Sequence, residues 1–426
     1  MAKRPFKPIP PMAELPPVED IDVKDILDRY LSGKIDLICV LGPTASGKTR
    51  YAVSLARKIN ELLGCGGASA EEKRATPLAA GGGTRSNAVG GVLFAEKANE
   101  LLGCGGASAE EKRATPLAAG GGTRSNAVGG VLFAADAPPQ AGTGEAQDKG
   151  GNAGTGEQRY GAEIISADSR QVYRGMDIGT GKDLNEYEEI PYHLIDIVEA
   201  GTKYNIFEYQ RDFEKTYKDI RDRGGIPILC GGSGLYIEAA TCGYSLPEVP
   251  ANPELRAELE KKSDEELISQ LASLKPLHNS TDYDTRKRLI RALEIAIFEA
   301  EHPVSHSTYL PKNTYYIGTS VSRDERNARI DRRLDSRLEE GMTDEIRSLI
   351  DGTHPALAPE NRPIPAADLI YYGLEYKFVT LYITGELTFE QMRSQLATAI
   401  HQFAKRQMTW FRGMERKGIT IHWTEV

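Results

Sequence analysis

The stretch ICVLGPTASGKTRYAV, residues 38–53, decides the fold of this chain. It fits the pattern G-x-x-x-x-G-K-[ST], in which a glycine-rich loop between a strand and a helix wraps a phosphate chain. The apolar run 36–41 predicts a buried parallel strand, and the apolar residues of 51–59 recur at helical spacing. Strand, loop and helix together predict a P-loop in a doubly wound α/β fold with a parallel sheet.

The chemistry of this loop predicts a site for a diphosphate or polyphosphate. Backbone N–H groups from Thr44 to Thr49 would point into the loop, and the helix N-terminus adds partial positive charge. Lys48 would neutralise the anion, and the Thr49 hydroxyl is a candidate ligand for Mg²⁺. The motif does not distinguish ATP from other phosphates. The predicted contacts are Gly42, Pro43, Thr44, Ala45, Ser46, Gly47, Lys48 and Thr49.

Length and composition limit the number of domains and the class of protein to be expected. The chain has 426 residues, a net charge of −9 and five cysteines, none of them in a C-x-x-C pair. This length suggests two or three domains, and the cysteine pattern fits a reducing cytoplasm. No run of 18 apolar residues exists, so a transmembrane helix is not expected. The proline-rich N-terminus lacks the apolar region of a secretory signal. The acidic balance argues against nonspecific nucleic-acid binding but allows a local basic site.

A duplicated segment interrupts the chain after the predicted P-loop helix. Residues 60–95 recur unchanged at 99–134, and a further glycine-rich tract follows. Two copies without a sustained apolar period do not predict a solenoid. The composition instead predicts a low-complexity insertion over 60–160 that loops out at the surface. Without it, the P-loop helix leads directly into the apolar run 162–166.

A second candidate site follows that apolar run. Asp168 comes directly after the predicted strand 162–166, at the sheet edge where the P-loop also lies. Its carboxylate could ligate Mg²⁺, act as a general base, or cap a following helix, and the residues alone leave these readings open. A third strand is predicted to end at Asp196. A fourth leads into the glycine turn 231–234, which allows close approach of a ligand or helix.

Six motifs in this order resemble the tRNA dimethylallyltransferase (tRNA isopentenyltransferase) family. They are GPTASGKT, AEIISADSRQVYRGMDIGTGK, HLIDI, GGSGLY, RLIRALEI and KRQMTWFR, and the resemblance runs from residue 36 to the C-terminus apart from 60–160. It implies transfer of a dimethylallyl group from dimethylallyl diphosphate to the exocyclic N6 amine of adenosine 37, beside the tRNA anticodon. The loop would then hold the diphosphate leaving group with Mg²⁺. Asp168 matches the family's general base, and Thr49 its diphosphate contact.

The resemblance also implies an RNA-binding surface. An adenosine in folded RNA must be unstacked before its amine can react, and cations beside aromatic rings suit such a strand. Arg329 and Arg333 align by spacing with arginines near the diphosphate. Two departures are visible: Ser233 replaces a usual threonine, and Glu375 replaces a basic residue, which puts one RNA contact in doubt. The implied tRNA contacts are Asp168, Ser169, Arg170, Gln171, Ser233, Lys287, Arg288, Leu289, Ile290, Arg291, Lys405, Arg406, Gln407, Met408, Thr409, Trp410, Phe411 and Arg412.

The predicted organisation is a P-loop core interrupted twice, acting as a monomer. Rival interpretations are a small-molecule P-loop kinase, an adenylate prenyltransferase with free AMP as acceptor, and a nonenzymatic nucleotide-binding scaffold. The insertion could also disable the enzyme, because it follows the P-loop helix. The predicted segments are an N-terminal extension (1–35), the core (36–59, 161–245 and 312–426, the last with C-terminal tRNA-binding helices), the insertion (60–160) and a helical insertion domain (246–311).

Overall fold

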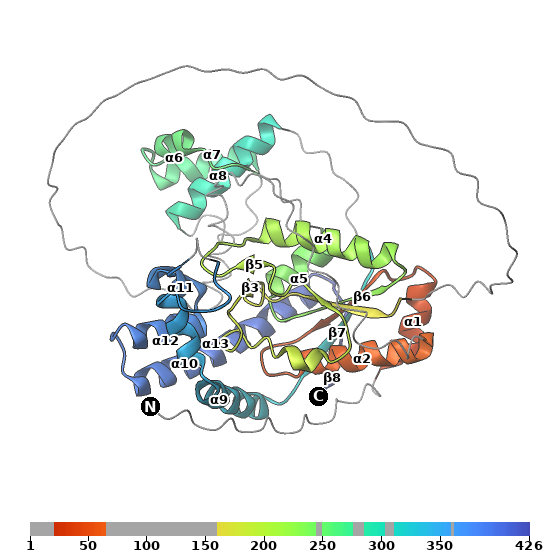
Figure 1. Ribbon diagram of the computed structural model, residues 1–426. Helices are drawn as coiled ribbons and strands as arrows, with labels where there is room; N and C mark the ends of the chain where they lie inside the picture. Colours follow the sequence, from red (N-terminus) through yellow and green to blue (C-terminus); the bar gives the residue numbers. More distant parts are fainter. Residues whose placement is uncertain (1–20, 65–159, 244–248, 276–284, 303–310, 359–361) are drawn as a thin grey trace, which may run out of the picture. The chain divides into compact units, whose positions relative to one another are not determined.

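A parallel six-stranded sheet organises the computed structural model (Figure 1), and the model describes residues 21–64, 160–243, 249–275, 285–302, 311–358 and 362–426. The strand order is β4-β2-β6-β1-β7-β8, and every pair runs parallel. The strands are β1 (Leu37–Leu41), β2 (Ala162–Ser166), β4 (Tyr192–His193), β6 (Ile226–Gly231), β7 (Thr314–Ser320) and β8 (Ile421–Glu425), and a separate pair joins β3 (Tyr173–Arg174) to β5 (Val198–Glu199).

The central strand β1 is buried on both faces, which explains its unbroken apolar sequence. Successive side chains of a strand point to opposite faces. Leu37, Cys39 and Leu41 accordingly join one apolar core, while Ile38 and Val40 join another on the other face. Helices cover both faces (Figure 1), as a parallel sheet requires.

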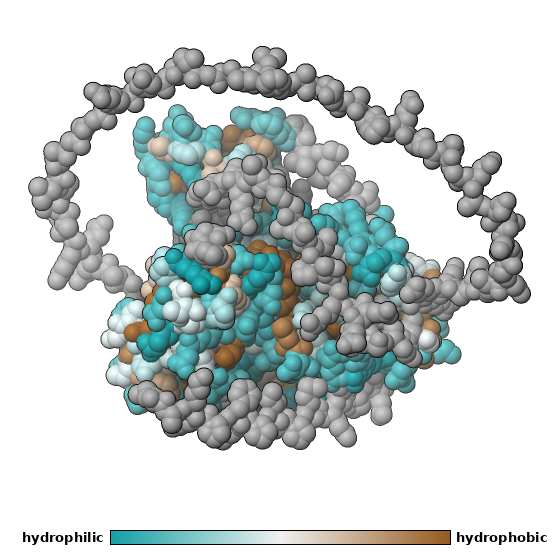
Figure 2. Space-filling model, viewed as in Figure 1, coloured by the Kyte–Doolittle hydropathy of each residue, from teal (hydrophilic) through white to brown (hydrophobic). Residues whose placement is uncertain are grey.

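Two groups of helices supply these cores. The face of Ile38 is covered by α1 (Val23–Leu31) and α2 (Lys48–Leu63). The face of Leu37 is covered by α4 (Ile206–Asp222), α5 (Gly234–Thr241), α9 (Arg323–Glu340), α10 (Met342–Ile350), α11 (Ala366–Tyr372), α12 (Leu374–Ile383) and α13 (Phe389–Arg416). The solvent side of α4 is hydrophilic, as Figure 2 shows. Among the helices of the described ranges, none combines the length and apolar character that a membrane span requires.

Three further helices form a small unit with its own apolar core. They are α6 (Pro253–Leu259), α7 (Asp264–Leu274) and α8 (Arg286–Glu301), and all lie within the predicted helical insertion. A capping box fixes the start of α7, where Ser263 accepts from the Glu266 N–H and Glu266 accepts from the Ser263 N–H. Leu267, Leu271 and Leu293 are buried between the helices.

Register places three loops at one edge of the sheet. Leu41 pairs with Gly231, and Ser166 pairs with Cys230, so β1, β2 and β6 end together. The P-loop, Asp168 and the glycine turn therefore meet at the carboxyl edge, which is the usual ligand edge of an open α/β sheet.

Two predicted boundaries need correction. The third strand does not run to Asp196: β4 ends at His193, because Leu194 and Asp196 take positive φ values of 61° and 56° that break an extended strand. The P-loop helix continues to Leu63, four residues into the predicted insertion, and ends at Gly64 in the left-handed conformation. Residues 65–159, with both copies of the repeat, lie outside the described residues.

Candidate functional site

The P-loop has the tight geometry that its glycines permit. Gly47, directly before α2, has a φ of 80°, and a Cβ on Gly42 would overlap the Thr319 side chain. Two of the backbone N–H groups predicted to face a phosphate are already used. The Thr44 N–H donates to Gln407 Oε1 at 2.8 Å, and the Ser46 N–H donates to the Pro43 carbonyl at 3.2 Å. Both N–H groups would have to release these acceptors to bind a phosphate, so the predicted phosphate contacts stay a prediction.

A polar pocket opens beside this loop, here called the P-loop pocket, and it unites the two predicted catalytic residues. Lys48, Thr49 and Asp168 all line it. Burial lowers the pKa of the Lys48 ammonium, an effect that the nearby Cys230 and Asp168 oppose. A partly buried cation, a hydroxyl and a carboxylate thus face one cavity at the N-terminus of α2, which suits an anionic ligand.

Asp168 does not cap a helix. Its Oδ1 accepts the Arg170 N–H at 2.8 Å within a turn, and the chain continues into β3. This hydrogen bond holds one carboxylate oxygen in place while the side chain faces the P-loop pocket. The interpretation of Asp168 as a helix cap is therefore wrong. Its interpretations as a general base and as a Mg²⁺ ligand stay open.

Helix α9 contributes two arginines to the lining of the P-loop pocket. Arg333 and Arg337 line the pocket, and both pair with Asp183, Arg337 at 3.5 Å. Burial acts to raise the pKa of Asp183, but the two guanidinium groups outweigh it and lower that pKa. Arg329, predicted beside Arg333, instead donates to the Val426 carbonyl at 3.2 Å and pairs with Glu325. Arg337 was missed by the sequence reasoning, although it lies one helical turn after Arg333.

Glu375, which replaces a basic residue of the family pattern, lines the P-loop pocket. Its Oε1 is 4.0 Å from Arg337 Nη1, and only 15% of its side chain is exposed. Burial raises the pKa of Glu375, and the Arg337 guanidinium opposes this shift. The acidic replacement therefore faces an arginine inside the pocket, where opposite charges attract.

A second pocket, here called the aromatic pocket, adjoins the first. It is lined by Tyr236, Phe403 and Trp410, together with Ser169 and Ser233, which also line the P-loop pocket. The Ser169 N–H donates to Ser233 Oγ at 3.2 Å, so the hydroxyl retained at position 233 ties the strand ends together at the border of the two pockets.

The residues predicted on α13 divide between the core and the surface. Phe411 is fully buried in the main core, and Gln407 is 6% exposed with its amide bound to the P-loop. Lys405, Thr409 and Arg412 are exposed on the other side of the helix, while Arg406, Met408 and Trp410 are partly buried. The 3.6-residue period of a helix separates these faces.

Most of the residues predicted on α8 face inward. Leu289 and Ile290 are buried in the small helical core, so their side chains have no surface to offer RNA. Arg288 is 2% exposed, and Arg291 pairs with Glu294 and donates to the Val249 carbonyl at 2.9 Å. Of the five predicted residues, Lys287 is the exposed one. The helical spacing of the apolar residues of α8 was visible in the sequence. The pairing of Arg291 with Glu294 inside the unit formed by α6, α7 and α8 was not predicted.

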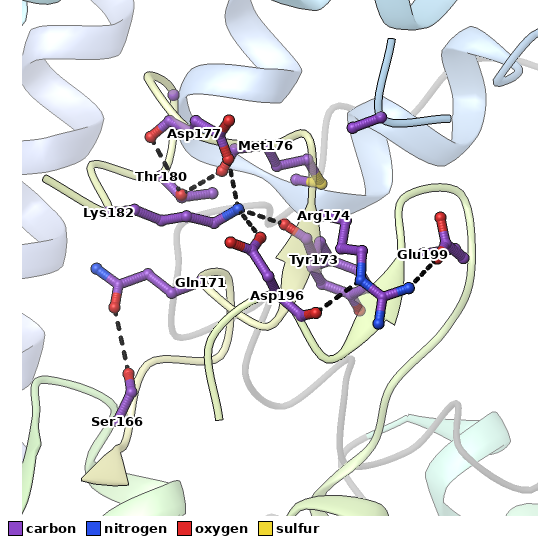
Figure 3. Close-up of polar contacts among 12 residues, drawn as sticks. Ser166, Gln171, Tyr173, Arg174, Met176, Asp177, Thr180, Lys182, Asp196 and Glu199 are labelled. Carbon is purple, nitrogen blue, oxygen red and sulfur yellow. Dashed lines mark hydrogen bonds and ion pairs between the residues drawn. The ribbon is translucent and has the colours of Figure 1, made fainter. Parts of the chain in front are cut away.

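The loop 179–181, which contains two glycines, forms a further wall of the P-loop pocket. Gly179, Thr180 and Gly181 line it, next to Gln171 of the predicted tRNA contacts. Gln171 Oε1 accepts from Ser166 Oγ at 3.2 Å (Figure 3). Its Nε2 donates to the Gly181 carbonyl at 3.1 Å, so both ends of the amide are held.

Comparison with known proteins gives one consistent family. The model of the family described as IPP transferase matches residues 171–414. A tRNA dimethylallyltransferase 1 of Parabacteroides distasonis is 58% identical over 267 residues, covering 62% of this chain and 84% of that protein. A tRNA dimethylallyltransferase 1 of Porphyromonas gingivalis is 56% identical over 271 residues, covering 63% and 86%. The crystal structure of a eukaryotic dimethylallyltransferase acting on tRNA has the same fold, with a TM-score of 0.53 at 19% identity, covering 92% of this chain and 74% of that one.

Proposed function

Because this chain belongs to the IPP transferase family, we propose a mechanism by which its site modifies tRNA. The enzyme transfers a dimethylallyl group from dimethylallyl diphosphate to N6 of adenosine 37 beside the anticodon, giving N6-isopentenyladenosine and diphosphate. The observation that carries the mechanism is the meeting of Lys48, Thr49 and Asp168 in one pocket at the end of the P-loop.

The P-loop pocket supplies groups for the leaving diphosphate. As the allylic C–O bond breaks, negative charge grows on the bridging oxygen and is stabilised by donors already in place. Lys48, Arg333 and Arg337 bring three positive charges to the pocket. Such fixed cations act more strongly in a partly buried site than in water.

The donor set fits Mg²⁺ as the metal. The Thr49 hydroxyl and the Asp168 carboxylate face the same pocket, and no cluster of three or more His, Cys, Asp or Glu suited to a metal occurs within the described residues. Mg²⁺ in such sites keeps water and phosphate ligands and needs few protein groups. Thr49 would hold it together with the diphosphate, and the bound ion would offset the charge of the leaving group.

Asp168 is the proposed general base. The amine lone pair of adenine is delocalised into the ring, so the N6 amine is a weak nucleophile. When N6 bonds to the allylic C1 and the C1–O bond breaks, the nitrogen becomes positive, and one N–H proton passes to the Asp168 carboxylate. The hydrogen bond from the Arg170 N–H holds that carboxylate in place.

The aromatic pocket suits the unstacked acceptor base. Tyr236, Phe403 and Trp410 line this pocket with aromatic rings, and the border residues Ser169 and Ser233 link it to Asp168. The exposed Lys405 and Arg412 on α13 would contact the RNA backbone. We propose that the enzyme acts as a monomer and meets its tRNA in the cytoplasm.

The test supplies labelled dimethylallyl diphosphate and Mg²⁺ with three acceptors: unmodified tRNA bearing A-A-A in its anticodon loop, AMP and ATP. Label is expected in tRNA alone, and Asp168→Asn should lower the rate about 10²- to 10⁴-fold. Asp222→Asn, an equal charge change at an exposed position, is the control and should keep the wild-type rate. Label in AMP would show that the enzyme prenylates a free nucleotide. Nucleotide hydrolysis without prenyl transfer would support a kinase-like enzyme.

A further inference from the structure

The carboxylate of Glu345 binds the loop behind the pocket wall. Its Oε2 accepts the N–H groups of Asp177 at 3.0 Å and Ile178 at 2.7 Å, and its Oε1 accepts the Gly179 N–H at 3.1 Å. The Tyr376 hydroxyl donates to the same Oε1 at 2.7 Å. Glu345 is 8% exposed and comes from α10. Hydrogen bonds to an ionised carboxylate are among the strongest in proteins, so this loop is firmly held.

A lysine holds the other end of the same loop. The Lys182 ammonium donates to the Tyr173 carbonyl at 2.7 Å and to Asp177 Oδ1 at 2.6 Å, and it pairs with Asp196. Figure 3 shows these contacts converging on its nitrogen. Lys182 is 2% exposed. An anion and a cation thus fix residues 177–182 at both ends, and the segment between them forms the pocket wall.

This wall sets the position of two groups inside the pocket. The Gly181 carbonyl accepts from Gln171 Nε2 at 3.1 Å and from Arg333 Nη2 at 3.4 Å. Gly181 has a φ of 61°, and a Cβ there would overlap the Arg337 guanidinium. The loop and the arginines are therefore in direct contact, and a shift of the loop would disturb the hydrogen bond that the Gly181 carbonyl accepts from Arg333.

We propose that Glu345 is a positioning residue for the diphosphate site: by holding the N–H groups of 177–179 it fixes the Gly181 carbonyl and, through it, the Arg333 guanidinium. This inference rests on the proposed function only for the identity of the ligand. Glu345 itself is absent from the residues that line the P-loop pocket. The competing explanation is that Glu345 only stabilises the fold.

The experiment is a double-mutant cycle on the binding of inorganic diphosphate with Mg²⁺, measured by calorimetry. Glu345→Gln keeps the size and shape of the side chain but replaces one carboxylate oxygen with an NH₂ group, which cannot accept a hydrogen bond from a backbone N–H. We expect it to weaken diphosphate binding about tenfold in the wild-type background but less than twofold in Arg333→Gln, because coupled residues are not additive. Asp344→Asn, the exposed neighbour on α10, should leave binding unchanged. An equal loss in both backgrounds, or no loss, would overturn the proposal.

A milder variant tests the same proposal in case Glu345→Gln does not fold. Tyr376→Phe removes one hydrogen bond to Glu345 and keeps the ring, and about a threefold loss with the same non-additivity toward Arg333→Gln is expected. Binding by Tyr376→Phe equal to wild type would count against the proposal. Binding of inorganic diphosphate does not depend on the acceptor, so a failure of prenyl transfer in the wild-type enzyme would reject the proposed function and leave this cycle interpretable.

Discussion

The side-chain amide of Gln407 joins the P-loop to the glycine turn. Its Oε1 accepts the Thr44 N–H at 2.8 Å, and its Nε2 donates to the Gly232 carbonyl at 2.9 Å. Gln407 belongs to α13, the helix that also exposes Lys405 and Arg412. One helix therefore carries a cationic surface on one side and touches the phosphate loop on the other.

Gln407→Glu should weaken donor binding. A carboxylate can accept from Thr44 but cannot donate to the Gly232 carbonyl, and two oxygen acceptors then face each other in a buried place. Loss of such a buried pair costs about 1–3 kcal/mol, and we expect the KM for dimethylallyl diphosphate to rise roughly tenfold. Steady-state kinetics at saturating tRNA measure this.

Gln402→Glu is the matched control for that variant, because it makes the same change at an exposed position of the same helix. It should leave the donor KM unchanged and show any general effect of added negative charge on α13. Equal increases in KM for the two variants would assign the effect to charge rather than to the bond with Thr44.

Arg337 should matter more to catalysis than Arg329. Arg337 lines the P-loop pocket, whereas Arg329 is occupied by Glu325 and the Val426 carbonyl. Loss of one cation that stabilises developing charge costs about 10²- to 10³-fold in rate. We therefore expect kcat/KM to fall by about that factor in Arg337→Gln and by less than about threefold in Arg329→Gln. A larger loss in Arg329→Gln than in Arg337→Gln would instead support Arg329 as the diphosphate contact, as the sequence spacing predicted.

The arginines also show where sequence reasoning works and where it stops. The P-loop was predictable because its glycines, lysine and flanking apolar runs are contiguous and local chemistry fixes them. Which turn of α9 faces the pocket depends on how the helix packs, and a spacing of three or four residues does not determine that direction. The inward pairing of Arg291 with Glu294 on α8 likewise depends on a tertiary contact. The Glu345 bonds join residues more than 160 positions apart, which no local pattern encodes.

Glu163 should make folding stability depend on acid pH. Burial acts to raise its pKa, but hydrogen bonds from His193 and Arg223 outweigh this and lower the pKa from 4.5 to about 2. A lowered folded-state pKa contributes stability above pH 4.5, and this contribution of roughly 3 kcal/mol disappears as pH falls from 4.5 toward 2.

Urea unfolding of wild type and Glu163→Gln measures that effect. The wild type should be more stable at pH 7, and the difference between the two proteins should narrow as pH falls from 4.5 toward 2. A difference that stays constant through this range would show that the carboxylate charge is not the source of the stability.

Removal of residues 65–159 should leave both the fold and the activity intact. The two flanks of this segment are linked by a hydrogen bond, because Asn60 Oδ1 accepts the Ala162 N–H at 2.7 Å. We expect a chain that runs from Gly64 directly to Tyr160 to keep this hydrogen bond between α2 and β2. Shortening a long connection changes closure entropy only slowly, so we expect the melting temperature to stay within about 5 °C of wild type.

The wider deletion of 60–160 provides the contrast. It removes Asn60 and the last turn of α2, which the sequence pattern assigned to the insertion. The Ala162 N–H at the start of β2 then loses its partner, and we expect lower stability by about 1–3 kcal/mol. Thermal unfolding and labelled prenyl transfer to tRNA, measured on both deletions, test the boundary. Loss of transfer in the 65–159 deletion with the fold retained would show that the insertion contributes to activity, whereas faster transfer would show that it hinders the P-loop.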